Sequence, residues 1–387
     1  MITNLRFENF TVFDDLRLSL SPRVNVVIGS NGTGKTHLLK AIYGLGLALQ
    51  SRRGGKSDKE FSADVSQKFL RIFLPEQNRV GILHAKGARN PGRLTLENND
   101  DSRISVSFSG RSKYFEIESS AKGSLTSTQP VFIPTKEVLS LVRGMRHLDH
   151  DQATLEMIFD DGYIDLAELL VRSGEDNTHS RMEDDPRLSS ILRELVALVG
   201  GRYQWTEDDA FKFQPGHYVV KADPARSGST VARAYQDSTV TRFVPKSPQA
   251  FSSSMTAEGY RKIGILHRLL SNGAINPGKT SVLLWDEPEA NLNPKLMKKL
   301  VQVLLELSRN GQQIVLATHD YVLLKWLDLL VDKGKGDHVK FHTLYRHPQT
   351  QKMDVESADS YSLISKTAIS DTFAELFDAD MKRALGE

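Results

Sequence analysis

The order of apolar and polar residues predicts strands in several parts of the chain. The apolar residues clustered at 24–28 are typical of a strand that is buried on both faces in a parallel sheet. Between residues 71 and 120, apolar residues recur at every second position, as in Ile104, Val106 and Phe108, and stretches such as NPG and NNDD interrupt them. We therefore expect an antiparallel β region near 71–120.

Helical periods follow the first buried strand and return in the middle of the chain. The apolar residues at 38–42 have helical spacing, and three amphipathic stretches between about 137 and 200 predict further helices. A β-like stretch near 211–223 follows them. The expected architecture is one α/β head in two parts with a mostly helical lobe inserted between them. The corresponding residue ranges are 1–136, 137–250 and 251–387.

Composition narrows the possible chemistry. The 387 residues are enough for one large domain or two modest ones. The net charge of +2 neither requires nor excludes a nucleic-acid partner, and the absence of cysteine excludes disulfides and thiolate chemistry. The chain begins without a signal-peptide pattern and contains no apolar run approaching the length of a membrane span, so we expect a soluble cytoplasmic protein without a membrane partner.

The first chemical motif lies between the strand at 24–28 and the helix that follows it. Residues 29–36 read GSNGTGKT and fit the phosphate-loop pattern G-x-x-x-x-G-K-[ST], whose backbone N–H groups close around a polyphosphate. Lys35 is expected to reach the β- and γ-phosphates of ATP, and the Thr36 hydroxyl to hold Mg²⁺. The residues expected to bind the nucleotide here are Asn31, Gly32, Thr33, Gly34, Lys35 and Thr36.

Two later motifs each place polar residues after a short apolar strand. The stretch LLWDEPEANLNP delivers Asp286 and Glu287, where Asp286 can support Mg²⁺ and Glu287 can activate the water that attacks the γ-phosphate. The stretch IVLATHD places His319 after a strand at 314–317, where an imidazole can hydrogen-bond a γ-phosphate or the attacking water. We therefore expect Glu287 and His319 to be catalytic, and Thr36 and Asp286 to bind the metal.

With these motifs the chain resembles the ABC-type ATPases of the RecF, SMC, Rad50 and OLD group, which belong to the AAA family ATPases. The matching stretches are LRFENFTVFDD, GSNGTGKT, LLWDEPEANLNP and LATHD. The resemblance implies a P-loop NTPase fold of the ABC-ATPase type, with an antiparallel β subdomain and an inserted helical lobe. It covers most of residues 1–40 and 250–325.

The resemblance also implies a symmetric homodimer. In this family two heads sandwich two ATP molecules between the phosphate loop of one head and the signature helix of the other. By resemblance, Gly259 opens the signature helix, Asn291 lies in the D-loop at the dimer interface, and His319 is the switch histidine.

Two stretches depart from the family pattern. In SSSMTAEGYRKIG, Ala257 occupies the place where the family has a serine, which leaves Thr256 or Ser254 as the alternative hydroxyl. The stretch VFIPTKEVL at 131–139 has the strand-then-helix form of the Q-loop but carries Thr135, Lys136 and Glu137 and no glutamine. A helix N-terminus at the signature position still offers N–H groups to a phosphate.

The implied function is that of an ATPase with a regulatory role. The stretch after His319 is too short for the TOPRIM nuclease of OLD-type proteins and reads as a hairpin followed by a closing helix; the middle of the chain lacks the long heptads of SMC coiled coils. A lone head fits a DNA-related sensor in DNA repair, or the ATPase of an anti-phage defence system whose effector, a nuclease or toxin, is a separate chain. The alternatives are a dimerisation switch with little turnover and the ATPase subunit of a transporter.

Two clusters leave their interpretation open. The basic residues of the loop near 51–60, together with Arg143 and Arg146, line a DNA path in one interpretation and form solvated faces in the other. The stretch HLDHDQ at 147–152 has ligand-type side chains, including His147 and Asp151 at helical spacing, and a solvated helix end is the favoured interpretation.

Overall fold

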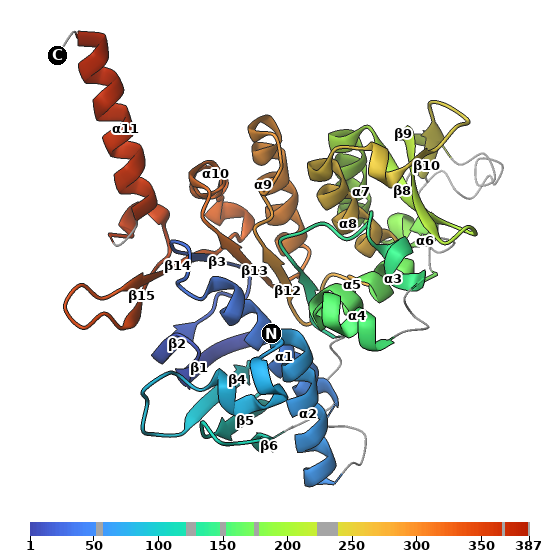
Figure 1. Ribbon diagram of the computed structural model, residues 1–387. Helices are drawn as coiled ribbons and strands as arrows, with labels where there is room; N and C mark the ends of the chain where they lie inside the picture. The colour runs from blue at the N-terminus through green and yellow to red at the C-terminus, as the bar shows by residue number, and fades with distance from the viewer. Residues whose placement is uncertain are drawn as a thin grey trace.

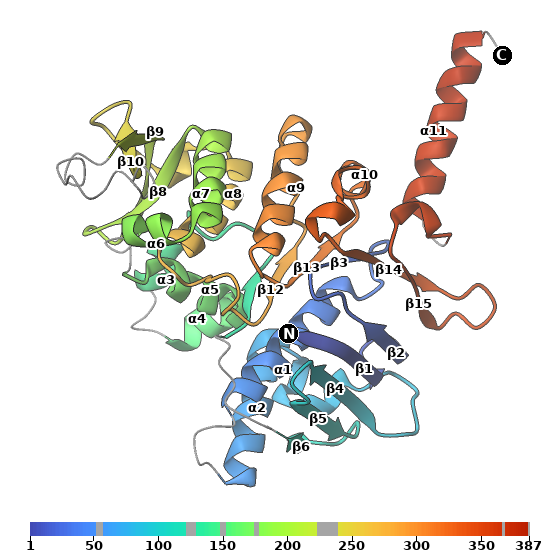
Figure 2. The same cartoon turned by 180° about the vertical axis from the view of Figure 1, so that it is seen from behind.

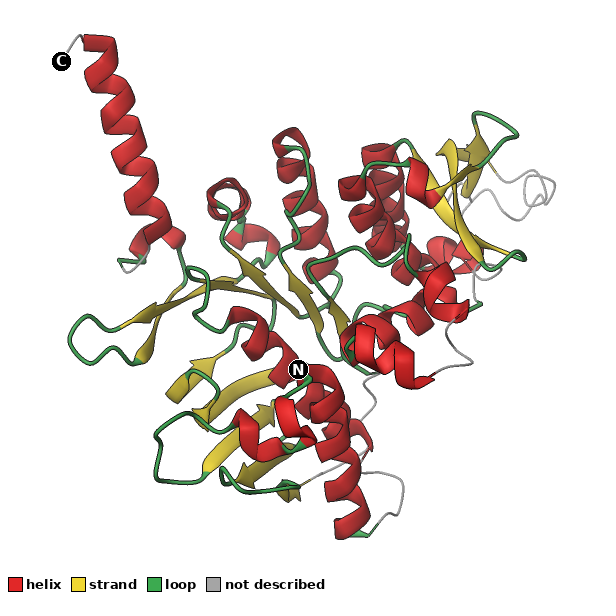
Figure 3. Cartoon of the chain, in the orientation of Figure 1, coloured by secondary structure: helices red, strands yellow, loops and turns green. Residues whose placement is uncertain are grey.

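The computed structural model describes residues 1–51, 57–120, 129–147, 152–173, 178–222, 239–365 and 368–385. A mixed sheet lies at the centre of the molecule, with an antiparallel sheet on one side of it and a layer of helices on the other (Figures 1 and 3). The lobe and the C-terminal helix lie at opposite ends of the molecule in both views (Figures 1 and 2). None of the described helices combines the length and hydropathy needed to cross a membrane.

The central sheet has six strands in the order β15-β14-β3-β13-β12-β7. All neighbours from β14 to β7 are parallel, and β15 is added antiparallel to β14 at one edge. Parallel strands end at the same edge of a sheet, so the residues after β3, β12 and β13 meet there. The strands are β3 (Val24–Ile28), β7 (Val131–Ile133), β12 (Leu283–Asp286), β13 (Ile314–Thr318), β14 (Val339–Arg346) and β15 (Met353–Ala358).

The strands that were predicted from apolar runs are buried on both faces in this sheet. In β12, Leu283 and Trp285 pack with the helices and the lobe, whereas Leu284 packs with the N-terminal part of the chain. In β3, Val26 and Val27 face opposite sides in the same way. Two hydrophobic cores therefore meet at the sheet, because a parallel strand with both faces covered has no solvent side.

The second sheet is antiparallel, in the order β2-β1-β4-β5-β6. Its strands are β1 (Ile2–Phe10), β2 (Phe13–Ser19), β4 (Gly92–Asn98), β5 (Arg103–Phe108) and β6 (Glu116–Ser120). The expected antiparallel region is confirmed, but it starts at Gly92 rather than at residue 71. The preceding residues form α2 (Asp58–Phe73) and short 3₁₀ turns. Ser57 and Glu60 make a capping box at the start of α2, which favours a helix there.

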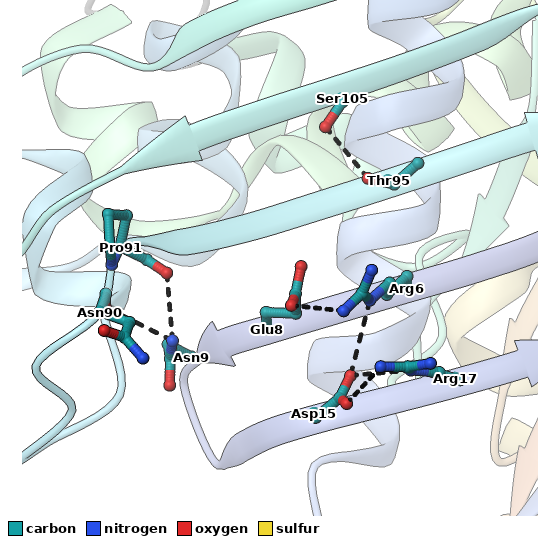
Figure 4. Close-up of polar contacts among 9 residues, drawn as sticks. All are labelled: Arg6, Glu8, Asn9, Asp15, Arg17, Asn90, Pro91, Thr95 and Ser105. Atoms are coloured by element: carbon teal, nitrogen blue, oxygen red, sulfur yellow. Dashed lines mark hydrogen bonds and ion pairs between the residues drawn. The ribbon is translucent and has the colours of Figure 1, made fainter.

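Polar contacts cover the solvent side of this sheet (Figure 4). Arg17 pairs with Asp15 at 2.9 Å and Arg6 with Glu8 at 2.7 Å, and these side chains are exposed or half-buried. Asn9, at the end of β1, has φ 50° and donates its amide to the carbonyl of Pro91 at 3.1 Å. The opposite side of the sheet packs on α1 (Lys35–Ser51), the helix that follows the phosphate loop.

The inserted lobe combines helices with a small antiparallel sheet, which contains the β-like stretch expected near 211–223. Its helices are α3 (Val142–His147), α4 (Gln152–Ile158), α5 (Asp161–Val171), α6 (Thr178–Asp184) and α7 (Pro186–Val199). A four-stranded antiparallel sheet follows, made of β8 (Gly201–Thr206), β9 (Ala210–Ala222), β10 (Thr239–Pro245) and β11 (Phe251–Ser252). Gly200 ends α7 with φ 73°, and the strands begin directly after it.

The C-terminal part contributes helices to the central sheet and one that leaves it. These helices are α8 (Glu258–Ser271), α9 (Pro294–Arg309), α10 (Tyr321–Leu330) and α11 (Ala368–Leu385). The expected hairpin is confirmed as β14 and β15. The expected final helix also forms as α11, but it extends away from the head instead of closing it (Figure 1). Residues 372–385 of α11 are exposed throughout, so the helix has little packing that would hold it against the head.

Candidate functional site

The phosphate loop joins β3 to α1 at the edge where the parallel strands end. Gly32 and Gly34 have φ 78° and 92°, values that L side chains rarely adopt. A Cβ on Gly34 would also lie 2.6 Å from the Val12 side chain, so this position requires glycine for space as well. Asn31 and Gly32 are exposed, whereas the Thr33 hydroxyl turns inward and donates to the Ser30 carbonyl at 2.8 Å.

Lys35 lies inside the loop rather than in solvent. Its ammonium donates to the carbonyl of Gly29 at 2.7 Å and to that of Ser30 at 3.1 Å. Burial lowers the pKa of Lys35, and the carboxylates of Glu287 and Asp286 oppose that shift. The lysine charge is therefore held within the loop's concave side, among acidic groups that come from β12.

Asp286 joins three parts of the chain. The Thr36 hydroxyl donates to its Oδ2 at 2.7 Å, and the Thr135 hydroxyl donates to the same oxygen at 3.1 Å. Burial raises the pKa of Asp286, and these two hydrogen bonds oppose the rise. Hydroxyl and carboxylate oxygens are the ligands that Mg²⁺ prefers, so Thr36 and Asp286 fit the metal role expected of them.

Thr135 is a contact that the sequence did not indicate. It lies in the stretch expected to be the Q-loop, after β7, and its hydroxyl takes a place beside Asp286. Glu137, two residues later, instead pairs with Arg261 of α8 at 3.0 Å. The stretch without a glutamine thus contacts both the Asp286 carboxylate and the signature helix.

Glu287 and His319 lie beside each other. His319 Nδ1 lies 3.0 Å from Glu287 Oε1, and the histidine side chain is half exposed. Glu287 has φ 47°, which is uncommon for a residue with a side chain, and such strained conformations cluster at active sites. The carboxylate and the imidazole therefore sit together at the same edge of the sheet as Asp286.

Lys262 supplies part of what holds Glu287. This lysine is 1% exposed in α8, and its ammonium donates to the backbone carbonyl of Glu287 at 2.9 Å. Burial lowers its pKa, and the carboxylates of Glu289 and Glu287 oppose the shift. In the sequence Lys262 resembles any basic residue of an amphipathic helix, so no local signal indicated this contact.

Glu289 is a second buried acid that the sequence did not single out. Its Oε1 accepts a hydrogen bond from the Thr318 hydroxyl at 2.5 Å, while its Oε2 is buried without a partner among the described residues. Burial raises the pKa of Glu289 to about 7. Thr318 Oγ in turn accepts from the Asp320 N–H at 3.0 Å, so Glu289 braces the backbone on both sides of His319.

The signature helix begins at the position expected from the sequence. Ala257 is the N-cap of α8 and offers no side-chain hydrogen bond to the first turn. The Thr256 hydroxyl is already used by Tyr203 Oη at 2.7 Å and by the Ser253 carbonyl at 2.6 Å. Ser254 is exposed and its hydroxyl lies 2.8 Å from that of Ser252. Of the two alternative hydroxyls, Ser254 is therefore the accessible one.

Gly259 and Asn291 lie against each other and form a second group. A Cβ on Gly259 would stand 2.5 Å from the Asn291 carbonyl oxygen, so α8 touches the D-loop backbone here. Asn291 has φ 62°, and Asn293 caps α9 by accepting from the Lys295 N–H at 3.0 Å. Lys262 and the loop that begins at Glu287 link this group to the site formed by Asp286, Glu287 and His319.

The remaining candidate residues, those of the DNA path and of the stretch at 147–152, are exposed or lie outside the described residues. Arg143 and Arg146 are exposed on α3, and Lys59 is exposed on α2. Arg52, Arg53, Lys56 and Asp151 lie outside the described residues, and His147 is an exposed residue at the end of α3. The possible DNA path and the stretch at 147–152 therefore remain untested predictions.

Comparison with known proteins bears on the family and the fold of the chain. A family model described as "AAA domain" matches residues 4–200, and a second, described as "AAA domain, putative AbiEii toxin, Type IV TA system", matches residues 158–325. Similar curated proteins are two named "DNA replication and repair protein RecF". The protein from Idiomarina loihiensis is 46% identical over 54 residues, and that from Staphylococcus aureus is 41% identical over 69 residues.

The RecF matches are local. They cover 14% and 17% of this chain, and they span only 15% and 18% of the two relatives. A solved structure, the SMC head bound to the C-terminal winged-helix domain of ScpA, aligns over 93% of this chain and 98% of its own with a TM-score of 0.50 at 15% identity. The chain therefore belongs to the AAA domain family, and its fold is that of an ABC-type ATPase head like those of RecF and SMC proteins.

Proposed function

We propose that this chain binds ATP with Mg²⁺ and hydrolyses it to ADP and phosphate. The observation that carries the proposal is the hydrogen bond between Thr36 and Asp286, because it joins the phosphate loop to an acidic strand end. Lys35 supplies the positive charge for the phosphates, and the N–H groups at the start of α1 add the dipole of a helix N-terminus. A bound Mg²⁺ would neutralise charge on the phosphates.

Glu287 is the proposed general base. Its carboxylate takes a proton from the attacking water, whose oxygen forms the new bond to the γ-phosphorus as the bond to the ADP oxygen breaks. His319, 3.0 Å away, orients this carboxylate and is placed to contact the γ-phosphate. Lys262 holds the Glu287 backbone by its hydrogen bond to the Glu287 carbonyl, so the base is held in one orientation.

The proposed working state is a homodimer with ATP sandwiched between two heads. In this dimer the N-terminus of α8 and the adjoining D-loop residue Asn291 form the surface that faces the nucleotide of the other head. Gly259 permits the close approach between them. Since Ala257 lacks a hydroxyl, the N–H groups of α8 and the Ser254 side chain are the groups left to contact phosphate.

The biological role that we propose is DNA-related sensing or regulation, in DNA repair or anti-phage defence. The local similarity to RecF and the match to a model named for a toxin system support it. A separate effector, a nuclease or a toxin, is the partner that we propose for this ATPase head. A dimerisation switch with little turnover is the second candidate, and Ala257 favours it. A transporter subunit is disfavoured, since the serine of the signature and the Q-loop glutamine are both replaced.

Two variants test the ATPase proposal. Lys35→Ala should abolish ATP binding in calorimetry while the circular dichroism spectrum stays unchanged, because it removes the loop's charge without touching the cores. Glu287→Gln should still bind ATP but hydrolyse it 10²- to 10⁴-fold more slowly, the usual contribution of a positioned base. Undiminished ATP affinity in a folded Lys35→Ala protein would refute the assignment of the phosphate loop. Normal ATP turnover in the Glu287→Gln protein would show that Glu287 is not the general base.

The variant Glu287→Gln also tests the proposed dimer. The Glu287→Gln protein does not hydrolyse its bound ATP, so it should accumulate as a dimer with ATP but not with ADP. Light scattering measures the mass in both cases. A mass that stays monomeric with ATP would contradict closure. For the DNA role, gel shifts across a salt series should show affinity for duplex that falls steeply with salt; no binding at low salt with ATP would redirect the search to a protein signal.

A further inference from the structure

His319 receives little support from contacts of its own side chain. The imidazole is half exposed, and within the described part of the chain its polar contact is the one with Glu287 Oε1 at 3.0 Å. A side chain with so few contacts keeps its direction only if the backbone that carries it is fixed. The residues on either side of His319 therefore decide where the imidazole lies.

Both neighbours of His319 are anchored by hydrogen bonds. Thr318 is fully buried, and its hydroxyl accepts from the Asp320 N–H at 3.0 Å and donates to Glu289 Oε1 at 2.5 Å. The Asp320 carboxylate in turn accepts from the Leu323 N–H at 2.6 Å at the start of α10. A hydroxyl carries a single hydrogen, and Thr318 directs its hydrogen to Glu289. The anchor before His319 therefore depends on an acceptor oxygen at residue 289.

Glu289 is an unfavourable residue for stability at this place. The residue is buried, and its Oε2 has no hydrogen-bond partner among the described residues. A buried polar atom without a hydrogen bond lowers the stability of the fold, whereas an apolar side chain of similar size would not. We therefore attribute the presence of a carboxyl here to the acceptor that it offers to Thr318.

The backbone of Glu289 is held from the D-loop side. The Leu292 N–H donates to the Glu289 carbonyl at 2.9 Å, and Asn291, in the same turn, lies against α8 at Gly259. One residue thus contacts the D-loop through its carbonyl and the strand before His319 through its carboxyl. A displacement of the D-loop would reach the switch histidine by this route.

On the basis of the ATP hydrolysis proposed above, we propose that Glu289 is a positioning residue, which holds His319 against Glu287 through the Thr318 hydroxyl. Glu289 acts through these neighbours, so its loss slows the chemical step. The residues expected to bind ATP, Lys35 and Thr36 among them, stay in place. The two parts of this expectation separate a positioning role from a general loss of structure.

Steady-state ATP hydrolysis by two variants of Glu289 gives the first test. Glu289→Gln keeps the acceptor oxygen and should hold kcat within about twofold of the parent. Glu289→Leu keeps a similar volume without an acceptor and should lower kcat about 10- to 100-fold, the scale of a misplacement of about 1 Å, while KM for ATP changes less than about threefold. Parent-like kcat in Glu289→Leu, or a KM that rises as kcat falls, would overturn the proposal.

The Gln variant also excludes a different role for Glu289. The carboxylate of Glu289 opposes the lowering of the Lys262 pKa by burial, so its charge could matter instead of its hydrogen bond. Gln removes the charge and keeps the acceptor. If Glu289→Gln is as slow as Glu289→Leu, balance of the Lys262 charge is the role, and the positioning proposal fails.

Thr318→Val tests the same contact from the other side and serves if Glu289→Leu does not fold. It removes the hydroxyl at nearly constant volume and should lower kcat as Glu289→Leu does. The double variant should be no slower than either single variant, because each removes the same hydrogen bond; additive losses would contradict the proposal. Thr343→Val is the matched control: Thr343 is buried in β14, its hydroxyl has no partner among the described residues, and kcat should stay unchanged.

A measurement without nucleotide separates this proposal from the ATPase proposal. Hydrogen bonding shifts the imidazole nitrogen resonances in NMR spectra, so those of His319, assigned with His319→Gln, report its contact with Glu287. Glu289→Gln should match the parent, whereas Glu289→Leu and Thr318→Val should both shift. Unchanged resonances in all three variants would overturn the positioning role even in an active ATPase. The expected shifts in a parent that does not hydrolyse ATP would refute the ATPase proposal and support the positioning of His319.

Discussion

Glu289 is a buried acid of the site whose pKa is raised. Its carboxyl is buried against Thr318, and burial raises its pKa to about 7 from an ordinary value of 4.5. The folded protein thus retains a proton that the unfolded chain releases. Its contribution to stability is full below about pH 4.5 and is lost as pH rises through 7.

Glu289→Gln should remove this pH dependence, because an amide keeps the acceptor for Thr318 and does not ionise. The free energy of unfolding of the variant, relative to the parent, should rise between pH 5 and pH 8 by an amount on the order of 2 kcal/mol. Urea unfolding at the two pH values measures it. Parallel pH profiles for the two proteins would show that Glu289 titrates normally.

At the scale of elements, the contact between α8 and the D-loop is the feature that joins the two halves of the site. Gly259→Ala places a Cβ 2.5 Å from the Asn291 carbonyl and 3.1 Å from Leu292 Cα, and both are backbone atoms that cannot rotate away. We expect a loss of about 1–3 kcal/mol in stability, the usual range for overpacking, and a lower ATP-driven dimer yield.

Gly144→Ala is the matched control for this change. Gly144 also lies in a helix, α3, but a Cβ there meets no atom within 4 Å. Alanine is the better helix former, so stability should stay unchanged or rise by up to about 1 kcal/mol. Thermal or urea unfolding of both variants checks the pair, and equal effects at the two positions would contradict the close approach at Gly259.

At the scale of the whole molecule, a charged cluster ties the lobe to the N-terminal half. Asp161 at the start of α5 is 1% exposed and pairs with Lys68 at 2.5 Å and with Arg71 at 2.8 Å, both on α2. Asp165, one turn later, accepts from the Tyr43 hydroxyl of α1 at 2.6 Å. These contacts fix the lobe against α1, the helix that carries the phosphate loop.

Asp161→Ala should therefore destabilise the protein, since Lys68 and Arg71 lose their buried partner and keep only the more exposed Asp165 and Glu156. The cations are about one-third exposed, which limits the loss of unfolding free energy to roughly 1–3 kcal/mol. Asp15→Ala, which breaks an exposed pair with Arg17 (Figure 4), should change stability by less than about 0.5 kcal/mol. Similar losses of unfolding free energy at both positions would show that the burial of Asp161 does not determine how much this cluster stabilises the protein.

The sequence by itself determined the features that depend on neighbouring residues. Apolar runs at 24–28, 282–285 and 314–317 indicated strands buried on both faces, and glycine positions with a following Lys-Thr indicated the phosphate loop. The same local patterns placed Asp286, Glu287 and His319 directly after short strands, where open α/β sheets place their ligands.

Only the tertiary structure decided the contacts between residues far apart along the chain. Thr135 beside Asp286 and Lys262 beneath Glu287 carry no local signal, because their roles depend on where separate elements come together. The last turn of α2 shows a further limit. The interrupted apolar pattern near residue 71 suits a strand or a helix, and the helix that begins at the Ser57–Glu60 capping box continues through it. For α11, the sequence determined an amphipathic helix but not its place, since a helix docks only where another surface matches its apolar face.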